Sequence, residues 1–401
     1  MHAIRLTFLL LLTASCTGAR RGTSGPATPA LVSVGTHPAA LAVLDAAASE
    51  PEPGVRAAAL AARIRTSAEP AGGPWGPRAV FDPSPWVRRA GAAALADRLP
   101  EEAAAAALRG LVGRSDADAY TRCGAAMHLA RAGDATALSA VQAAIDAASG
   151  GWEVAPCALA AASMGSPAAV PALEAALEEG ELPLELGFVA DLASSGLVAV
   201  APAVGTAVGL VEEPLRIPLA GAWMELGGAG GAAVLRTAIT EGTVEEQMTA
   251  LDQVVDSDAP AADDLLQRAA AADGPVRAYA RLVLAARSGE LGPAVAAAED
   301  ADDRDARALA MDAAGLLVAR LDDPGARVAR KARALLVVGL QDPDDAVRLA
   351  AVRSLSRVGT AAEAAALEPL LEAEGATLRV AAAAALLQLG GDPGPGAGGA
   401  G

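Results

Sequence analysis

The feature that most constrains this chain is one phrase that returns at a nearly constant distance. An apolar residue, an arginine and small residues recur at successive spacings of 32, 34, 34, 31, 31, 30, 29, 30, 41 and 31 residues, with degenerate copies in the middle. The eleven copies begin at Val55, Val87, Thr121, Ala155, Leu186, Ile217, Gln247, Val276, Ala306, Val347 and Leu378. A constant period of this length predicts a solenoid, in which each copy buries its apolar face by stacking on its neighbours.

Each copy has room for two helices and two short turns. In one copy Asp342 is a suitable N-cap, Pro343 stands where a helix tolerates proline best, and Gly359 ends the helix. The apolar residues between them follow one helical face: Val347, Ala350, Ala351, Leu355 and Val358. Only 2% of all residues are aromatic, and the small side chains that dominate favour closely packed helices. We therefore predict an all-α fold of about eleven helical hairpins.

The segments VRLAAVRSLSRVG and VRAAALAARI resemble HEAT repeats of the short bacterial kind, which also occur in phycobilin-lyase-like proteins. The resemblance covers about residues 38–391, strongly at both ends and weakly from 155 to 270. It implies a right-handed α-solenoid. It also implies a ladder of Asp–Arg pairs along one ridge, in which Arg348 could reach Asp344 or Asp345. A structural role for these arginines and direct contact with a ligand both stay open.

The N-terminus predicts export. Residues 1–15 read as a signal peptide, residues 16–37 as a flexible linker and residues 392–401 as a disordered Gly/Pro tail. The stretch that ends in Cys16 resembles a bacterial lipobox, which implies that Cys16 is lipidated. Thr17 in place of aspartate then implies an outer-membrane anchor facing the periplasm. Ordinary cleavage after Ala19, which would give a secreted or periplasmic protein, is the alternative.

The net charge of −17 is concentrated in the middle of the chain, where residues 132–267 hold 20 acidic and two basic residues. This argues against nucleic acid as a partner and favours another protein, such as a basic one. The alternative is that the charge serves solubility alone. The candidate contact residues are Glu178, Glu179, Glu181, Glu185, Glu212 and Glu213, with Trp152 and Trp223 nearby. A proline-rich segment from residue 74 to 86 adds Trp75 and Trp86, as a recognition loop or as a capping plug over the first repeats.

Catalytic patterns are scarce. We find no HExxH, GxSxG, Walker or dinucleotide-binding motif, and none of the three histidines has a following glutamate. The His–Glu pairs with which deoxyhypusine hydroxylase, an enzyme of similar repeats, holds iron are thus missing. Cys123 and Cys157 occupy the same place in successive copies. We expect two buried thiols there, because stacked helices lie about 8–10 Å apart and a disulfide needs Cα atoms within about 7 Å. A bridge between them in an oxidising compartment is the alternative.

The sequence as a whole predicts an exported, lipid-anchored protein-binding scaffold or adaptor with no catalytic residue, metal or cofactor. A HEAT-based enzyme or lyase-like factor is one alternative. A purely structural envelope spacer is the other.

Overall fold

The computed structural model describes residues 37–134, 136–148, 150–180, 182–183, 185–300 and 302–390. The segments predicted as signal peptide and Gly/Pro tail, the predicted linker up to residue 36, Cys16 and Glu181 lie outside these ranges. Within them the secondary structure is helical and includes no strand, so the all-α solenoid is confirmed.

Every predicted copy begins in the first helix of a pair, which confirms the register. The first helices are α3 (Pro53–Thr66), α5 (Pro85–Ala96), α7 (Ala119–Arg131), α9 (Gly151–Ser163), α11 (Leu186–Ser194), α13 (Arg216–Glu225), α15 (Val244–Val255), α17 (Pro275–Arg287), α19 (Arg304–Arg320), α21 (Asp345–Val358) and α23 (Ala376–Leu389). The second helices are α4 (Trp75–Val80), α6 (Glu102–Val112), α8 (Leu138–Asp146), α10 (Ala169–Glu179), α12 (Ala201–Leu210), α14 (Ala229–Glu241), α16 (Ala262–Ala271), α18 (Gly292–Ala298), α20 (Arg327–Gly339) and α22 (Ala361–Ala364), which continues into the 3-10 helix η3 (Ala365–Glu372).

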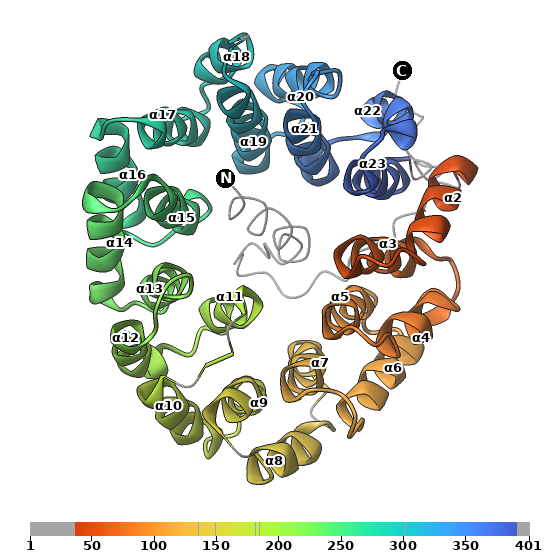
Figure 1. Ribbon diagram of the computed structural model, residues 1–401, viewed down its shortest axis with the longest axis vertical. Helices are drawn as coiled ribbons and strands as arrows, with labels where there is room; N and C mark the ends of the chain where they lie inside the picture. The colour runs from red at the N-terminus through yellow and green to blue at the C-terminus, as the bar shows by residue number, and fades with distance from the viewer. Residues whose placement is uncertain are drawn as a thin grey trace. The chain divides into compact units, whose positions relative to one another are not determined.

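The helices group into two compact units. Unit 1 comprises residues 76–281, and unit 2 comprises residues 37–75 with 282–390 among the described residues. Within unit 1 the first helices α5, α7 and α9 pack side by side, and the second helices α10 and α12 form a neighbouring row (Figure 1). The first helices α19, α21 and α23 pack in the same way within unit 2. The longest repeat step contains α19, whose 17 residues make it longer than the other first helices.

The first helix of the described chain completes the last repeat. Helix α2 (Pro38–Ala47) packs against α23, η3 and α3, all within unit 2. In several other repeats the second helix packs against the first helix of its own repeat. Helix α2 packs in this way against α23, the first helix of the last repeat. His37, expected in the linker, caps α2 by accepting a hydrogen bond from the Ala40 amide at 3.3 Å.

The recurring arginine is hydrogen-bonded to the loop that precedes its own helix. Its guanidinium donates to backbone carbonyls five to seven residues earlier: Arg56 to Glu50 and Pro51, Arg88 to Asp82 and Pro83, Arg277 to Ala272, Arg307 to Asp300, Arg348 to Asp342, and Arg379 to Ala373 and Glu374. These carbonyls lie outside the helices and need a donor when water is excluded. The arginine is therefore a structural residue of these six hairpins.

Some of these arginines also join one repeat to the next. Arg88 lies 3.0 Å from the carboxylate of Asp118, and Arg307 lies 2.8 Å from that of Asp342. Arg348 contacts Asp345 in its own helix, as the predicted ladder requires. The ladder thus combines pairs within a repeat and pairs between repeats.

The expectation of two free thiols is wrong, because Cys123 and Cys157 form a disulfide between α7 and α9. Their Cα atoms are 4.8 Å apart. The expectation compared the distance between helix axes with a distance between Cα atoms. Each Cα lies about 2.3 Å from its axis, so facing Cα atoms approach much more closely than the axes do. Ala and Gly neighbours on both helices permit this approach.

Replacing the first-helix arginine should destabilise the fold. Arg88→Met keeps the apolar stem but leaves the Asp82 and Pro83 carbonyls and part of Asp118 without their donor, at a side chain that is only 8% exposed. We expect a loss of about 2–4 kcal/mol in the free energy of unfolding, measured by urea titration. Arg268→Met, whose side chain is 48% exposed beside Asp264, should leave the midpoint nearly unchanged. Equal shifts of the urea midpoint in the two variants would contradict the structural role of Arg88.

Candidate functional site

Four of the predicted glutamates gather where two second helices of unit 1 end. Glu178 and Glu179 are the last residues of α10, and Glu212 and Glu213 follow α12. Gly180 caps α10 in the left-handed conformation, with φ of 69°. A Cβ on this glycine would lie 2.9 Å from the Leu210 Cβ at the end of α12, so the two helix ends touch. We call the four exposed glutamates Glu178, Glu179, Glu212 and Glu213 the acidic edge.

Glu178 and Glu179 are unfavourable for the helix that carries them, whereas Glu212 and Glu213 also precede α13, whose N-terminus suits carboxylates. A helix C-terminus already bears partial negative charge, and cations are the side chains that stabilise it. Neither α10 nor α12 has a basic residue in its last turn. Arg216 lies 3.2 Å from Glu213 and screens one member of the group. Leu210 is 55% exposed between the two pairs, so the edge offers carboxylates around an apolar side chain.

The other two predicted glutamates do not extend this surface. Glu185 is the N-cap residue of α11, and its carboxylate contacts the guanidinium of Arg89 on α5. It is therefore half-buried and already paired. Glu181 lies outside the described residues.

The predicted tryptophans differ in exposure. Trp152, at the start of α9, is 51% exposed and available for contact. Trp223 on α13 is half-buried, and its indole covers three glycines: a Cβ on Gly205, Gly228 or Gly230 would lie within 2.4 Å of it. These glycines belong in part to a glycine-rich stretch from residue 227 to 231. It forms the turn at Gly227 and the start of α14, and it makes room for this indole.

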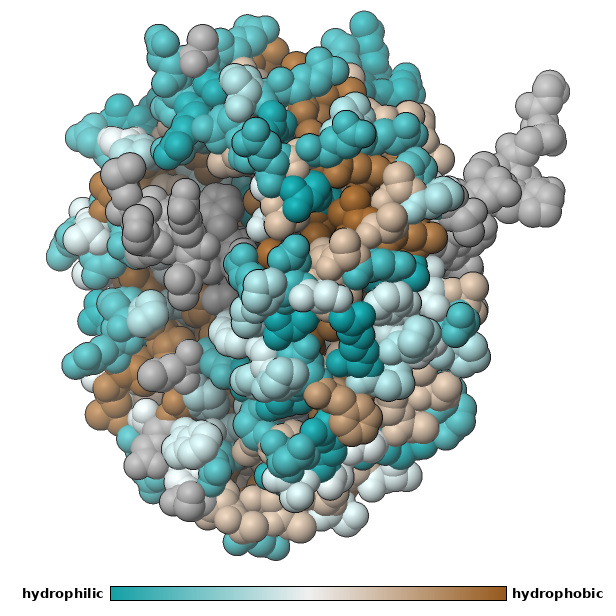
Figure 2. Space-filling model, turned by 45° about the vertical axis from the view of Figure 1, so that its right-hand side comes forward, coloured by the Kyte–Doolittle hydropathy of each residue, from teal (hydrophilic) through white to brown (hydrophobic). Residues whose placement is uncertain are grey.

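The aromatic residues of the proline-rich segment differ in exposure. Trp75 is half-buried in unit 2, with the Arg63 guanidinium 4.7 Å from its ring centre. Phe81 and Trp86 in unit 1 are 66% and 47% exposed, and Arg114 stacks 4.5 Å from the Phe81 ring. Figure 2 shows a face on which hydrophobic residues emerge as separate patches among hydrophilic ones. Exposed aromatic side chains of this kind are frequent anchors for partners.

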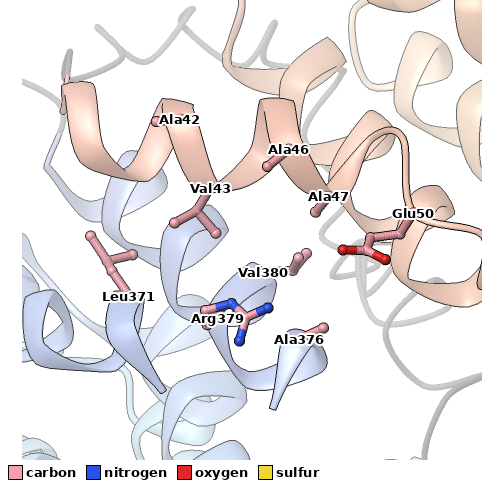
Figure 3. A pocket seen from close by; sticks show the side chains of 9 residues that line it. All are labelled: Ala42, Val43, Ala46, Ala47, Glu50, Leu371, Ala376, Arg379 and Val380. Carbon is pink, nitrogen blue, oxygen red and sulfur yellow. The ribbon is translucent and has the colours of Figure 1, made fainter. Parts of the chain in front are cut away.

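A shallow pocket of about 330 Å³ lies in unit 2 between α2 and α23 (Figure 3). Alanine and valine side chains form most of its wall, and the charged residues at it are Glu50 and Arg379. Arg379 is already bonded to the carbonyls of Ala373 and Glu374. This pocket offers packing space but no group for catalysis.

Two further searches gave negative results for the described residues. They contain no group of three or more His, Cys, Asp or Glu side chains that could hold a metal ion. No helix in the same ranges is both long and apolar enough to cross a membrane.

Sequence reasoning missed a polar cluster that joins α5, α7 and α11. Arg89 stacks 4.4 Å from the Tyr120 ring centre and donates to Asp118 at 2.9 Å. Burial raises the pKa of Tyr120, and burial raises the pKa of Asp191 to about 6 against the opposing charge of Arg131. One signal in the sequence was available, because Asp191 is the one charged residue of the apolar helix LGFVADLAS.

Comparisons with known proteins identify no family. No protein-family model matches the chain, and no curated protein matches it. An engineered protein of known crystal structure aligns with 88% of this chain and 99% of its own, at 16% identity and a TM-score of 0.26. The UNC-45 chaperone, described as binding and folding muscle myosin, aligns with 86% of this chain and 51% of its own, at 11% identity and a TM-score of 0.24. The chain thus spans about half the length of that chaperone. Likenesses this low carry no argument about this chain.

The position of the acidic edge predicts an unusual stability effect. Glu178→Lys and Glu179→Lys should each raise the free energy of unfolding by roughly 0.3–1 kcal/mol at low ionic strength, because a cation suits the C-terminus of α10. The matched control is Glu245→Lys in the first turn of α15, where a carboxylate is favourable and reversal should destabilise. Urea titration measures both. Destabilisation by the α10 reversals would show that these carboxylates support the fold.

Proposed function

We propose that this protein is a non-catalytic scaffold that binds a basic protein at the acidic edge of unit 1. The observation that carries the proposal is the gathering of Glu178, Glu179, Glu212 and Glu213 at two touching helix ends. Carboxylates that the helices do not need for stability are available for a partner. Their summed field attracts basic side chains over several ångströms, and the exposed Leu210 between them adds an apolar contact.

We further propose that the protein is exported and anchored through a lipid on Cys16. The apolar run from Leu6 to Leu12, followed by small residues and Cys16, supports this. The disulfide between Cys123 and Cys157 supports export independently, because such bonds persist mainly in oxidising compartments. The periplasmic face of an outer membrane would then be the place where the partner is met.

The exposed aromatic pair supports a second binding surface on the same scaffold. Phe81 and Trp86 could anchor a partner by apolar contact, without dependence on salt. The purely structural spacer and the HEAT-based enzyme remain the competing functions. A spacer would bind nothing saturably, and an enzyme would lose turnover on mutation of one carboxylate.

Reversal of the acidic edge should abolish partner capture. Crosslinking pull-downs from native envelope fractions would compare the wild type with the variant in which Glu178, Glu179, Glu212 and Glu213 are all replaced by lysine. We expect a co-purifying basic protein that is lost in this variant and weakens as salt increases, because exposed charges are screened at about 8 Å in physiological salt.

The control for this experiment reverses four exposed carboxylates elsewhere and has the same net charge. These are Glu241, Asp256, Glu290 and Glu299. Capture by the control variant at the wild-type level would assign binding to the acidic edge. Equal loss of partner capture in both variants would show that net charge alone causes the effect. If no protein is enriched in any sample, the result would favour the spacer.

Anchoring has its own test. Cys16→Ala should move the protein from the membrane fraction to the soluble fraction and remove the mass of the lipid, measured by fractionation and intact mass spectrometry. Cys16→Ser should behave identically, because lipidation needs the thiol. Unchanged fractionation and mass in both variants would contradict the anchor.

A further inference from the structure

We propose that α11 is a pH-sensitive latch, a helix that docks on α5 and α7 through polar contacts and loosens as the carboxyl group of Asp191 loses its proton. In a solenoid each repeat is expected to contact its immediate neighbours. Helix α11 belongs to the repeat after α9, yet its side chains reach α7 and α5. These contacts therefore add a connection that the repeat architecture does not require.

The first contact lies at the start of α11. The carboxylate of Glu185 pairs with the guanidinium of Arg89, which lies 96 residues earlier on α5. Arg89 also donates to the hydroxyl of Thr121 at 3.2 Å and to Asp118 at 2.9 Å. One arginine thus connects α5, α7 and α11, and its charge is balanced by two carboxylates.

The second contact is a close fit between an aromatic ring and a glycine. Phe188 is fully buried and meets the Tyr120 ring edge-on, with the ring centres 6.5 Å apart. A Cβ on Gly187 would lie 2.6 Å from the Tyr120 hydroxyl oxygen. Only glycine allows α11 to approach α7 this closely.

The third contact places an ionisable group at the edge of the seam, where the Asp191 side chain is 24% exposed. Asp191 lies 3.5 Å from Arg131 of α7 and accepts a hydrogen bond from the Tyr120 hydroxyl. Arg131 also donates to the hydroxyl of Ser194 at 2.9 Å. The pKa of Asp191 is raised to about 6, chiefly by burial, which Arg131 and Tyr120 only partly offset.

The charged and titratable groups near α11 come from its N-cap residue and from α5 and α7. They are Glu185, Arg89, Asp118, Arg131 and His128. Burial lowers the pKa of His128 to about 4, and hydrogen bonds from Thr121 and Arg89 lower the pKa of Asp118 despite its burial. Helix α13 also packs against α11, but its ionisable residues Arg216 and Glu225 lie at its two ends and are exposed. Asp191 is the carboxyl group of this seam whose pKa is raised, to about 6.

The sign of the effect follows from the raised pKa. A carboxyl group that binds its proton more tightly in the docked state stabilises docking while it is protonated. This contribution is complete below the ordinary pKa near 4 and is lost as the pH rises through about 6. The equilibrium constant for the opening of α11 should therefore increase about tenfold between pH 5 and pH 7. Both pH values lie above the isoelectric point of about 4.6.

Hydrogen exchange of the intact protein tests the latch. Peptides that cover residues 186–194 would be followed by mass spectrometry at pH 5 and pH 7, after correction for the intrinsic exchange rate. The wild type should show the tenfold increase in opening. Asp191→Asn cannot ionise and should show none, whereas Asp146→Asn on the exposed surface of α8 should behave like the wild type.

A second variant separates the latch from simple destabilisation. Glu185→Gln removes the Arg89 pair and should raise opening at both pH values while keeping the tenfold change. Should Asp191→Asn fail to fold, the carboxyl carbon of Asp191 in the wild type can be titrated by NMR. The proposal is overturned if wild-type opening does not change with pH, if Asp191→Asn retains the change, or if Asp191 titrates near pH 4.

Discussion

Hydrogen bonds from an arginine of the first helix to the loop before it stabilise six of the eleven hairpins. A stack of hairpins places a loop beside every pair of helices, and the carbonyls of these loops have no helical partner. Arg88 and Arg307 satisfy such carbonyls and also reach a carboxylate of the next repeat. One side chain therefore fixes both the turn and the stacking, which explains why the arginine recurs with the period of the repeat.

The hairpins that carry the acidic edge lack the recurring arginine, because their copies begin with Ala155-Pro156 and Leu186-Gly187. Glu178 and Glu179 end α10, and Glu212 and Glu213 follow α12. Small residues such as Gly180 bring α10 and α12 together there without any charge pairing. Repeat proteins commonly use the surface between their repeats for binding, and here that surface carries the charge of the middle of the chain.

The sequence predicted the fold well because the repeat is a local signal. All eleven copies begin in first helices, and even the degenerate copy at Gln247 kept its register. The sequence predicted the four glutamates only as neighbours along the chain. It could not predict that they share one edge, because that depends on the contact between Gly180 and Leu210. The pairing of Glu185 with Arg89 and the packing of α2 on α23 could not be read, because both join residues far apart in the sequence. The disulfide was not predicted because the distance between helix axes was compared with the limit that a disulfide sets on the distance between Cα atoms.

The most direct test of the binding claim is zero-length carbodiimide crosslinking in native envelope fractions, followed by mapping of the crosslinked carboxylates. The reagent joins carboxylates to amines, and Lys331 is the single lysine of this chain, so crosslinks to other lysines must come from a partner. We expect partner lysines joined to Glu178, Glu179, Glu212 or Glu213. Partner crosslinks confined to carboxylates of unit 2, or none at all, would contradict the acidic edge as the binding site.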